Sequence, residues 1–192
     1  MKNWKFYNRI RFYLNRLYRV SVSFKKQEEL VWKDIKKIHQ ESEWRFGIYE
    51  RERYVETAFS ITDDYHEKYY YMLHDNHYQC RVRFMHQFPS DLTTDMFVLA
   101  THFNNVLKNG VVVVNPTDQY VEYQQRLNIL VPLLYSGEIH SLLIDHYNTS
   151  RDIYAAFQRL VLEGEAPAII IADLLNSFKK EERDENGQAN DQ

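Results

Sequence analysis

Two histidines that flank a short polar stretch are the first residues here whose types and spacing could do chemistry. His74 and His77 stand on either side of Asp75-Asn76, and zinc commonly binds His together with Asp or Glu. No further Cys or His pair lies close by in the sequence, and polar residues of this kind are typical of the tip of a β-hairpin. We therefore interpret both histidines as turn residues and expect neither a metal nor another cofactor.

Cys80 and a pair of carboxylates are the other candidates for chemistry. A nucleophilic thiol needs a lowered pKa, supplied by a helix N-terminus or a fixed His. Cys80 instead alternates along a strand with Val82 and Phe84, which favours a small core residue. Asp91 and Asp95 stand one helical turn apart, but in the first turn of a helix they offset its exposed N–H dipoles.

The chain contains none of the common catalytic or phosphate-binding motifs. It has no Gly-rich phosphate loop among its five glycines, and neither G-x-S-x-G nor H-E-x-x-H occurs. We therefore expect that the protein is not an enzyme.

Composition indicates one globular domain with extensions. Hydrophobic residues make up 44% and charged residues 27% of 192 residues, which is typical of a folded domain. A single cysteine excludes an internal disulfide framework and favours a reducing compartment. No apolar run approaches the length of a membrane span, and the N-terminus is a poor secretory signal. The sequence therefore predicts a cytoplasmic protein.

The N-terminal segment differs from the rest of the chain in charge. Residues 1–27 carry eight Lys and Arg and no acidic residue; since the whole chain carries −3, the remainder carries −11. Residues 1–20 predict an amphipathic helix. Its polar face includes the candidate contacts for an anionic surface, Lys5, Arg9, Arg11, Arg16 and Arg19.

Three interpretations of this helix remain open. It could pack on its own domain or on a neighbouring subunit, which we prefer. It could lie on an anionic membrane surface. It could also follow nucleic-acid phosphates, which is the least favoured because the rest of the chain is acidic.

The remaining pattern predicts an α+β fold. A helix over about 25–40 precedes three strands, a helix opening near Ser90, two strands around Asn115-Pro116, and helical residues 133–163 that form one helix or two. Gly164 stops this region, and a last helix runs to about residue 178. We expect an antiparallel sheet of about five strands in the order α-β-β-β-α-β-β-α, covered by helices and preceded by the extra helix. The expected divisions are residues 1–22, 23–178 and a disordered polar tail, 179–192.

The second hairpin is the candidate contact surface. Four consecutive valines (111–114) predict a strand buried on both faces, and the return strand alternates. Tyr120, Tyr123 and Gln125 are expected to be exposed. An interface centre is rich in aromatic residues and poor in charge, so the candidate partner-binding residues are Val112, Val114, Tyr120, Tyr123 and Gln125.

Three stretches resemble the YbjN family of bacterial proteins: FVLATHFNNVLKNG, VEYQQRLNI and DIYAAFQRLVLEGEAP. The similarity of element order covers residues 25–178, and the recognisable residues lie mainly within 97–167. The family shares its fold with type III secretion chaperones and is labelled a sensory transduction regulator. It has no agreed catalytic residues, so none is carried over, and the segment 1–20 lies outside the pattern.

The resemblance implies regulation through protein contacts. The first hypothesis is a non-catalytic, chaperone-like domain that forms a homodimer and binds another polypeptide. The alternative is a peripheral tether in which residues 1–20 bind an anionic membrane surface; nucleic acid is a less favoured target.

Overall fold

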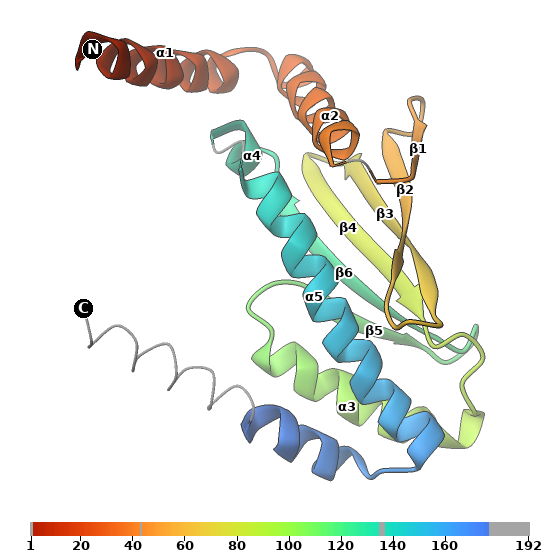
Figure 1. Cartoon of the computed structure of the whole chain (residues 1–192). Helices are drawn as coiled ribbons and strands as arrows, with labels where there is room; N and C mark the ends of the chain where they lie inside the picture. The colour runs from red at the N-terminus through yellow and green to blue at the C-terminus, as the bar shows by residue number, and fades with distance from the viewer. Residues whose placement is uncertain (1, 43, 135–136, 177–192) are drawn as a thin grey trace, which may run out of the picture. The chain divides into compact units, whose positions relative to one another are not determined.

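The computed structural model describes residues 2–42, 44–134 and 137–176, and it confirms the α+β class (Figure 1). The helical elements are α1 (Lys2–Ser21), α2 (Phe24–Glu41), the 3-10 turn η1 (Ser90–Leu92), α3 (Thr93–Val106), α4 (Leu130–Leu134), α5 (Glu138–Gln158), the π-helical turn η2 (Arg159–Glu163) and a helix over 167–176. The strands are β1 (Phe46–Tyr49), β2 (Tyr54–Ser60), β3 (His66–His74), β4 (His77–Phe84), β5 (Val111–Asn115) and β6 (Tyr120–Asn128).

The antiparallel sheet has six strands in the order β1-β2-β3-β4-β6-β5. The expectation of about five strands missed β1, which pairs with β2 from Phe46↔Thr57 to Tyr49↔Tyr54. The first hairpin that the sequence predicted is confirmed. Asp75 and Asn76 at its tip have φ of 45° and 65°, the left-handed pair that a tight two-residue turn requires.

The chain folds as two compact units that interleave along the sequence. One unit contains residues up to Val82 together with Gln124–Ser150, and the other contains Arg83–Tyr123 together with the described residues after Ser150. The predicted division at residue 22 falls between α1 and α2. The predicted tail, 179–192, lies outside the described residues.

Aromatic side chains from strands and helices form the core of the first unit. Tyr69 and Tyr71 on β3 are fully buried, as are Val31 and Ile35 on α2. The Tyr69 hydroxyl lies 2.7 Å from Ser150 Oγ on α5, so its polar end has a partner inside the core. The strands alternate buried and half-exposed positions, as in β4, because helices cover one face of the sheet.

The second unit has its own stacked aromatic core. Phe103 on α3 and Phe157 on α5 are both buried, and their rings stack with centroids 6.2 Å apart. Phe84 meets Tyr154 edge to face at 6.0 Å. Arg159 then links the end of this helical region to Glu165 and Asp173 through ion pairs of 2.6 and 2.7 Å.

The helical region 133–163 is more than one helix, and its longest part is continuous at Asn148. The preceding helix, α4, ends at Leu134, and α5 begins at Glu138. Gly164 follows η2 with a φ of 68°, which confirms the predicted stop. No helix in the described ranges is long and apolar enough to cross a membrane.

Gly164 provides a direct test of this stop. Replacing it with alanine places a Cβ on left-handed backbone, and we expect the free energy of unfolding to fall by about 1 kcal/mol in urea titrations. Gly137→Ala is the matched control, because its Cβ would meet open space and its φ lies outside the left-handed range. If Gly164→Ala and Gly137→Ala are equally stable, Gly164 is not required for the left-handed stop after η2.

Candidate functional site

His74, His77 and Cys80 all lie in the β3–β4 hairpin. Cys80 is fully buried in β4, and burial raises the pKa of its thiol far above the usual range, so this thiol stays protonated. His77 Nδ1 lies 2.6 Å from the Asp75 carbonyl oxygen, and His74 Nε2 lies 3.1 Å from the Asp75 carboxylate. Within the described residues, no group of three or more His, Cys, Asp or Glu could hold a metal ion.

The four valines of β5 alternate between the two faces of the sheet. Val112 and Val114 are 3% and 7% exposed, whereas Val111 and Val113 are 41% and 37% exposed. The expectation of burial on both faces is therefore wrong, because α3 packs against β5 and only one face of the strand is covered. Val112 and Val114, two of the candidate partner-binding residues, point into the core.

The outer edge of β5 is occupied by a side chain of α3. The Asn104 side-chain amide donates to the Val112 carbonyl oxygen at 3.0 Å, and its Oδ1 accepts from the Val112 N–H at 2.7 Å. Both backbone groups of one strand residue point to the same side of the strand. Asn104 therefore takes the place that a neighbouring strand would occupy at this edge.

The other three candidate partner-binding residues lie on the two faces of β6: Tyr123 and Gln125 on one face and Tyr120 on the other. Tyr123 and Gln125 are 0% and 2% exposed, so the expectation that they are exposed is wrong. Tyr123 can be buried because its hydroxyl donates to the Asn109 carbonyl oxygen at 3.0 Å. Tyr120 is half-buried on the opposite face, where the Arg83 guanidinium stacks 3.7 Å from its ring centroid.

The cations of α1 are not equivalent. Arg9 and Arg11 are exposed, and Arg16 is half-buried with its guanidinium 3.8 Å from the Phe12 ring centroid. Arg19 forms an ion pair with Asp34 of α2, which binds the last turn of α1 to the first unit. The Lys5 side chain lies outside the part of the chain whose side chains are described.

Three tyrosines and a methionine lie together on the open face of the first unit, across β1, β2 and β3; Tyr49 is exposed and the others are half-buried. This tyrosine cluster consists of Tyr49, Tyr54, Tyr70 and Met72. The rings of Tyr49 and Tyr54 stack at 4.2 Å with an interplanar angle of 13°, and Tyr70 follows at 6.2 Å from Tyr54. Met72 is directly opposite Tyr54 in the strand register.

The cluster has a fixed geometry and a polar margin. The Tyr49 ring lies beside Gly47, where an added Cβ would be in ordinary van der Waals contact with it at 3.4 Å. Burial raises the pKa of the Tyr54 phenol, with further contributions from Tyr49 and Glu56, so its hydroxyl remains a donor. The pair Lys68–Glu56, with 2.8 Å between Nζ and Oε1, borders the rings. Sequence reasoning missed this cluster, although the alternation of β2 and β3 was its signal.

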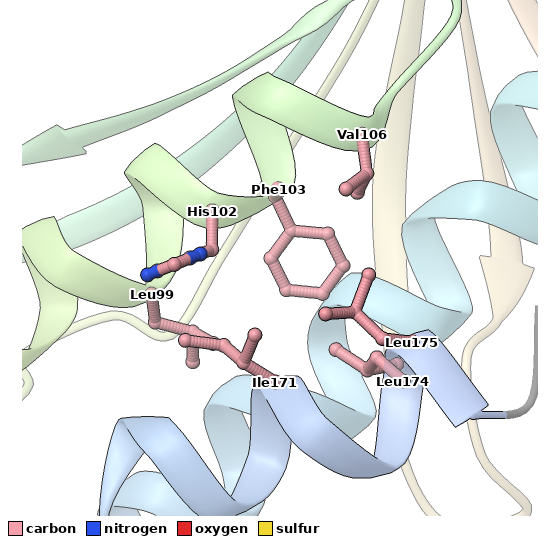
Figure 2. A pocket seen from close by; sticks show the side chains of 7 residues that line it. All are labelled: Leu99, His102, Phe103, Val106, Ile171, Leu174 and Leu175. Carbon is pink, nitrogen blue, oxygen red and sulfur yellow. The ribbon is translucent and has the colours of Figure 1, made fainter.

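An apolar hollow lies in the second unit, between α3 and helix 167–176 (Figure 2). The side chains that line it are Leu99, His102, Phe103, Val106, Ile171, Leu174 and Leu175. Figure 2 shows the Phe103 ring pointing from α3 toward the leucines of the other helix. The hollow measures about 40 Å³, whereas small-molecule pockets occupy roughly 300–1,000 Å³. It has room for a few waters only.

Comparison with known proteins adds no family assignment. No protein-family model matches the chain, and no curated protein sequence matches it at a significant level.

Proposed function

We propose that this protein is a non-catalytic regulatory domain that acts as a homodimer and binds another polypeptide. The resemblance to YbjN proteins and type III secretion chaperones supports the chaperone-like mode of action and the dimer. The tyrosine cluster is the observation that carries the proposal, and it replaces the buried valines as the expected contact surface.

The chemistry of the cluster fits a protein partner. Tyrosine and methionine are enriched at the centres of protein interfaces, and charged residues are depleted there. The stacked rings of Tyr49 and Tyr54 are already ordered, so binding costs little side-chain entropy. Each ring offers apolar area together with a hydroxyl that can reach the backbone of a bound chain. The Lys68–Glu56 pair supplies a charged rim.

Replacing two rings tests the proposal. We expect Tyr54→Ser/Tyr70→Ser to weaken retention of a bound polypeptide on the order of tenfold to a hundredfold, because aromatic anchors dominate binding energy. The measurement is quantitative affinity capture, followed by titration of the captured polypeptide against each purified variant. Phe97→Ser is the control, because Phe97 is an aromatic residue of the second unit that is 45% exposed on α3 and is not part of the cluster.

The mass of the protein in solution provides the second measurement. Sedimentation velocity is expected to give twice the mass of one chain for both wild type and the double variant. A monomer, or a polypeptide retained equally by the double variant and wild type, would contradict the proposal.

A further inference from the structure

An apolar arc on α1 stays exposed although the helix packs against α4 and α2 of the first unit. Its large side chains are 42–63% exposed: Tyr7, Ile10, Tyr13, Leu14, Leu17 and Tyr18. On α2, by contrast, Val31 and Ile35 are fully buried. The apolar stripe of α2 is therefore buried in the core of the first unit. The apolar arc of α1 is not buried there and is open to a contact outside this unit.

Basic side chains lie at both margins of this arc. At about 100° per residue, the six apolar residues span about 140° of the helix surface. Arg11 follows the arc at the Tyr18 margin, and Arg9 and Arg16 follow it at the Tyr13 margin. The segment 1–27 contains no acidic residue. A flat anionic surface can therefore meet the arc and both margins at once.

The last turn anchors the helix to the folded unit. Arg19 pairs with Asp34, and Gln27 Nε2 donates to the Val20 carbonyl oxygen at 2.8 Å. These contacts remove Arg19 from the set that a surface would bind. The arc lies on the part of α1 before this anchored turn, together with the exposed cations Arg9 and Arg11 and with Arg16, which is half-buried beside Phe12.

We propose that α1 lies in the plane of an anionic phospholipid bilayer and attaches the protein to it, a function beyond the proposed polypeptide binding. Leu14, Leu17 and Ile10 enter the acyl boundary, while the tyrosine hydroxyls stay at headgroup depth. The arginine stems extend along the apolar surface and place their guanidiniums on lipid phosphates. The remainder of the chain carries −11, so the same lipids repel it and attract only the N-terminal segment.

The width of the arc favours a bilayer over a helix from a second copy. A two-helix seam uses a narrow apolar stripe, with two positions in seven. The proportion of apolar positions in the arc of α1 is about twice that of such a seam. Cations also border the arc on both sides. A planar, negatively charged interface matches both properties.

Vesicle flotation of the full chain tests the proposal. We expect binding to phosphatidylcholine vesicles that contain phosphatidylserine, little binding to phosphatidylcholine alone, and release at high salt. Arg9→Gln/Arg11→Gln/Arg16→Gln should weaken partitioning on the order of 100-fold, since each cation near the surface contributes about fivefold. The matched control removes the same charge from exposed arginines elsewhere, Arg45→Gln/Arg51→Gln/Arg126→Gln, and should retain most of the binding.

A second pair of variants tests the apolar arc. Leu14→Ser/Leu17→Ser should reduce binding at least tenfold. Leu162→Ser/Ile169→Ser, at residues 70% and 55% exposed in the second unit, should not. Circular dichroism confirms that each variant is folded. The proposal is overturned if wild type does not float with anionic vesicles, if the arginine triple variant floats like wild type, or if Leu14→Ser/Leu17→Ser only converts a dimer to a monomer. Binding of an oligonucleotide without binding of vesicles overturns it as well.

Discussion

Replacing Asn104 with alanine is expected to lower the free energy of unfolding by about 1–3 kcal/mol, because two backbone groups of β5 lose their partner. In the native protein the Asn104 amide satisfies both the N–H and the carbonyl of Val112. Asn104 is itself exposed, so water replaces the two bonds in part, and each bond contributes a net of about 0.5–1.5 kcal/mol. The loss is measured by urea denaturation followed by circular dichroism.

The same variant is expected to self-associate. An open β-edge flanked by the exposed Val111 and Val113 is a template for pairing with another chain. Light scattering at increasing protein concentration measures this effect. Asn105→Ala is the matched control, because Asn105 is an exposed asparagine at the next position of α3. If both variants unfold at the same urea concentration and remain equally dispersed, Asn104 does not protect the edge.

Acid is expected to destabilise the first unit through His39. The His39 side chain is fully buried on α2, and burial lowers its pKa from the usual 6.5, although the hydrogen bond from Nδ1 to the Ile35 carbonyl oxygen acts in the opposite direction. The Nε2 atom is buried without a hydrogen-bond partner. A proton added there would therefore create a buried cation whose new N–H has no acceptor.

The surroundings of His39 determine the sign of the effect. Its ring contacts Trp44, Phe46 and Tyr71 at centroid distances of 5.8, 6.0 and 5.2 Å. Of these, Tyr71 is titratable, and burial raises the pKa of its phenol, so it stays neutral. The unfolded chain binds a proton at His39 more readily than the folded chain does. Stability is therefore complete above about pH 6.5 and is lost as the pH falls through the lower folded-state pKa.

Thermal unfolding between about pH 7 and pH 5 measures this dependence. His39→Phe keeps an aromatic ring in place but removes the proton-binding site, so its melting temperature should fall less over this range. His140→Gln is the control, since His140 is exposed on α5, and it should follow wild type. If the melting temperature of His39→Phe depends on pH as steeply as that of the wild type, His39 is not the cause of the acid sensitivity.

Local signals were sufficient to predict several elements of the fold. The apolar spacing of α2, the polar turn between β3 and β4, and the stop at Gly164 each depend on a few neighbouring residues. The β1–β2 hairpin was not predicted. Its turn is charged and contains neither Gly nor Asn, although Arg53 adopts a φ of 51° there. Identical valines in β5 show no alternation, so the sequence could not indicate which of them face solvent.

Predicting the candidate site depended on information from several strands. Tyr123 shares its strand face with Val121, which is also buried, so the alternation itself placed Tyr123 inside. Its burial further required a carbonyl partner from Asn109, outside the strand. The tyrosine cluster forms only when β1, β2 and β3 pair in the observed register. That register is a tertiary property that the periodicity of a single strand does not contain.

The interleaving of the two units has a consequence for protein synthesis. The first unit needs Gln124–Ser150 as well as the chain before Val82, so a nascent chain cannot complete it until Ser150 has left the ribosome exit tunnel. The strands β2, β3 and β4 emerge well before α5, which supplies Ser150 as the partner of Tyr69. The part of their buried faces that α5 covers must therefore stay exposed until then, and transient exposure of apolar surface favours aggregation. Truncating the gene between the codons for Tyr123 and Ser150 leaves both units incomplete, so neither can be produced as a contiguous fragment.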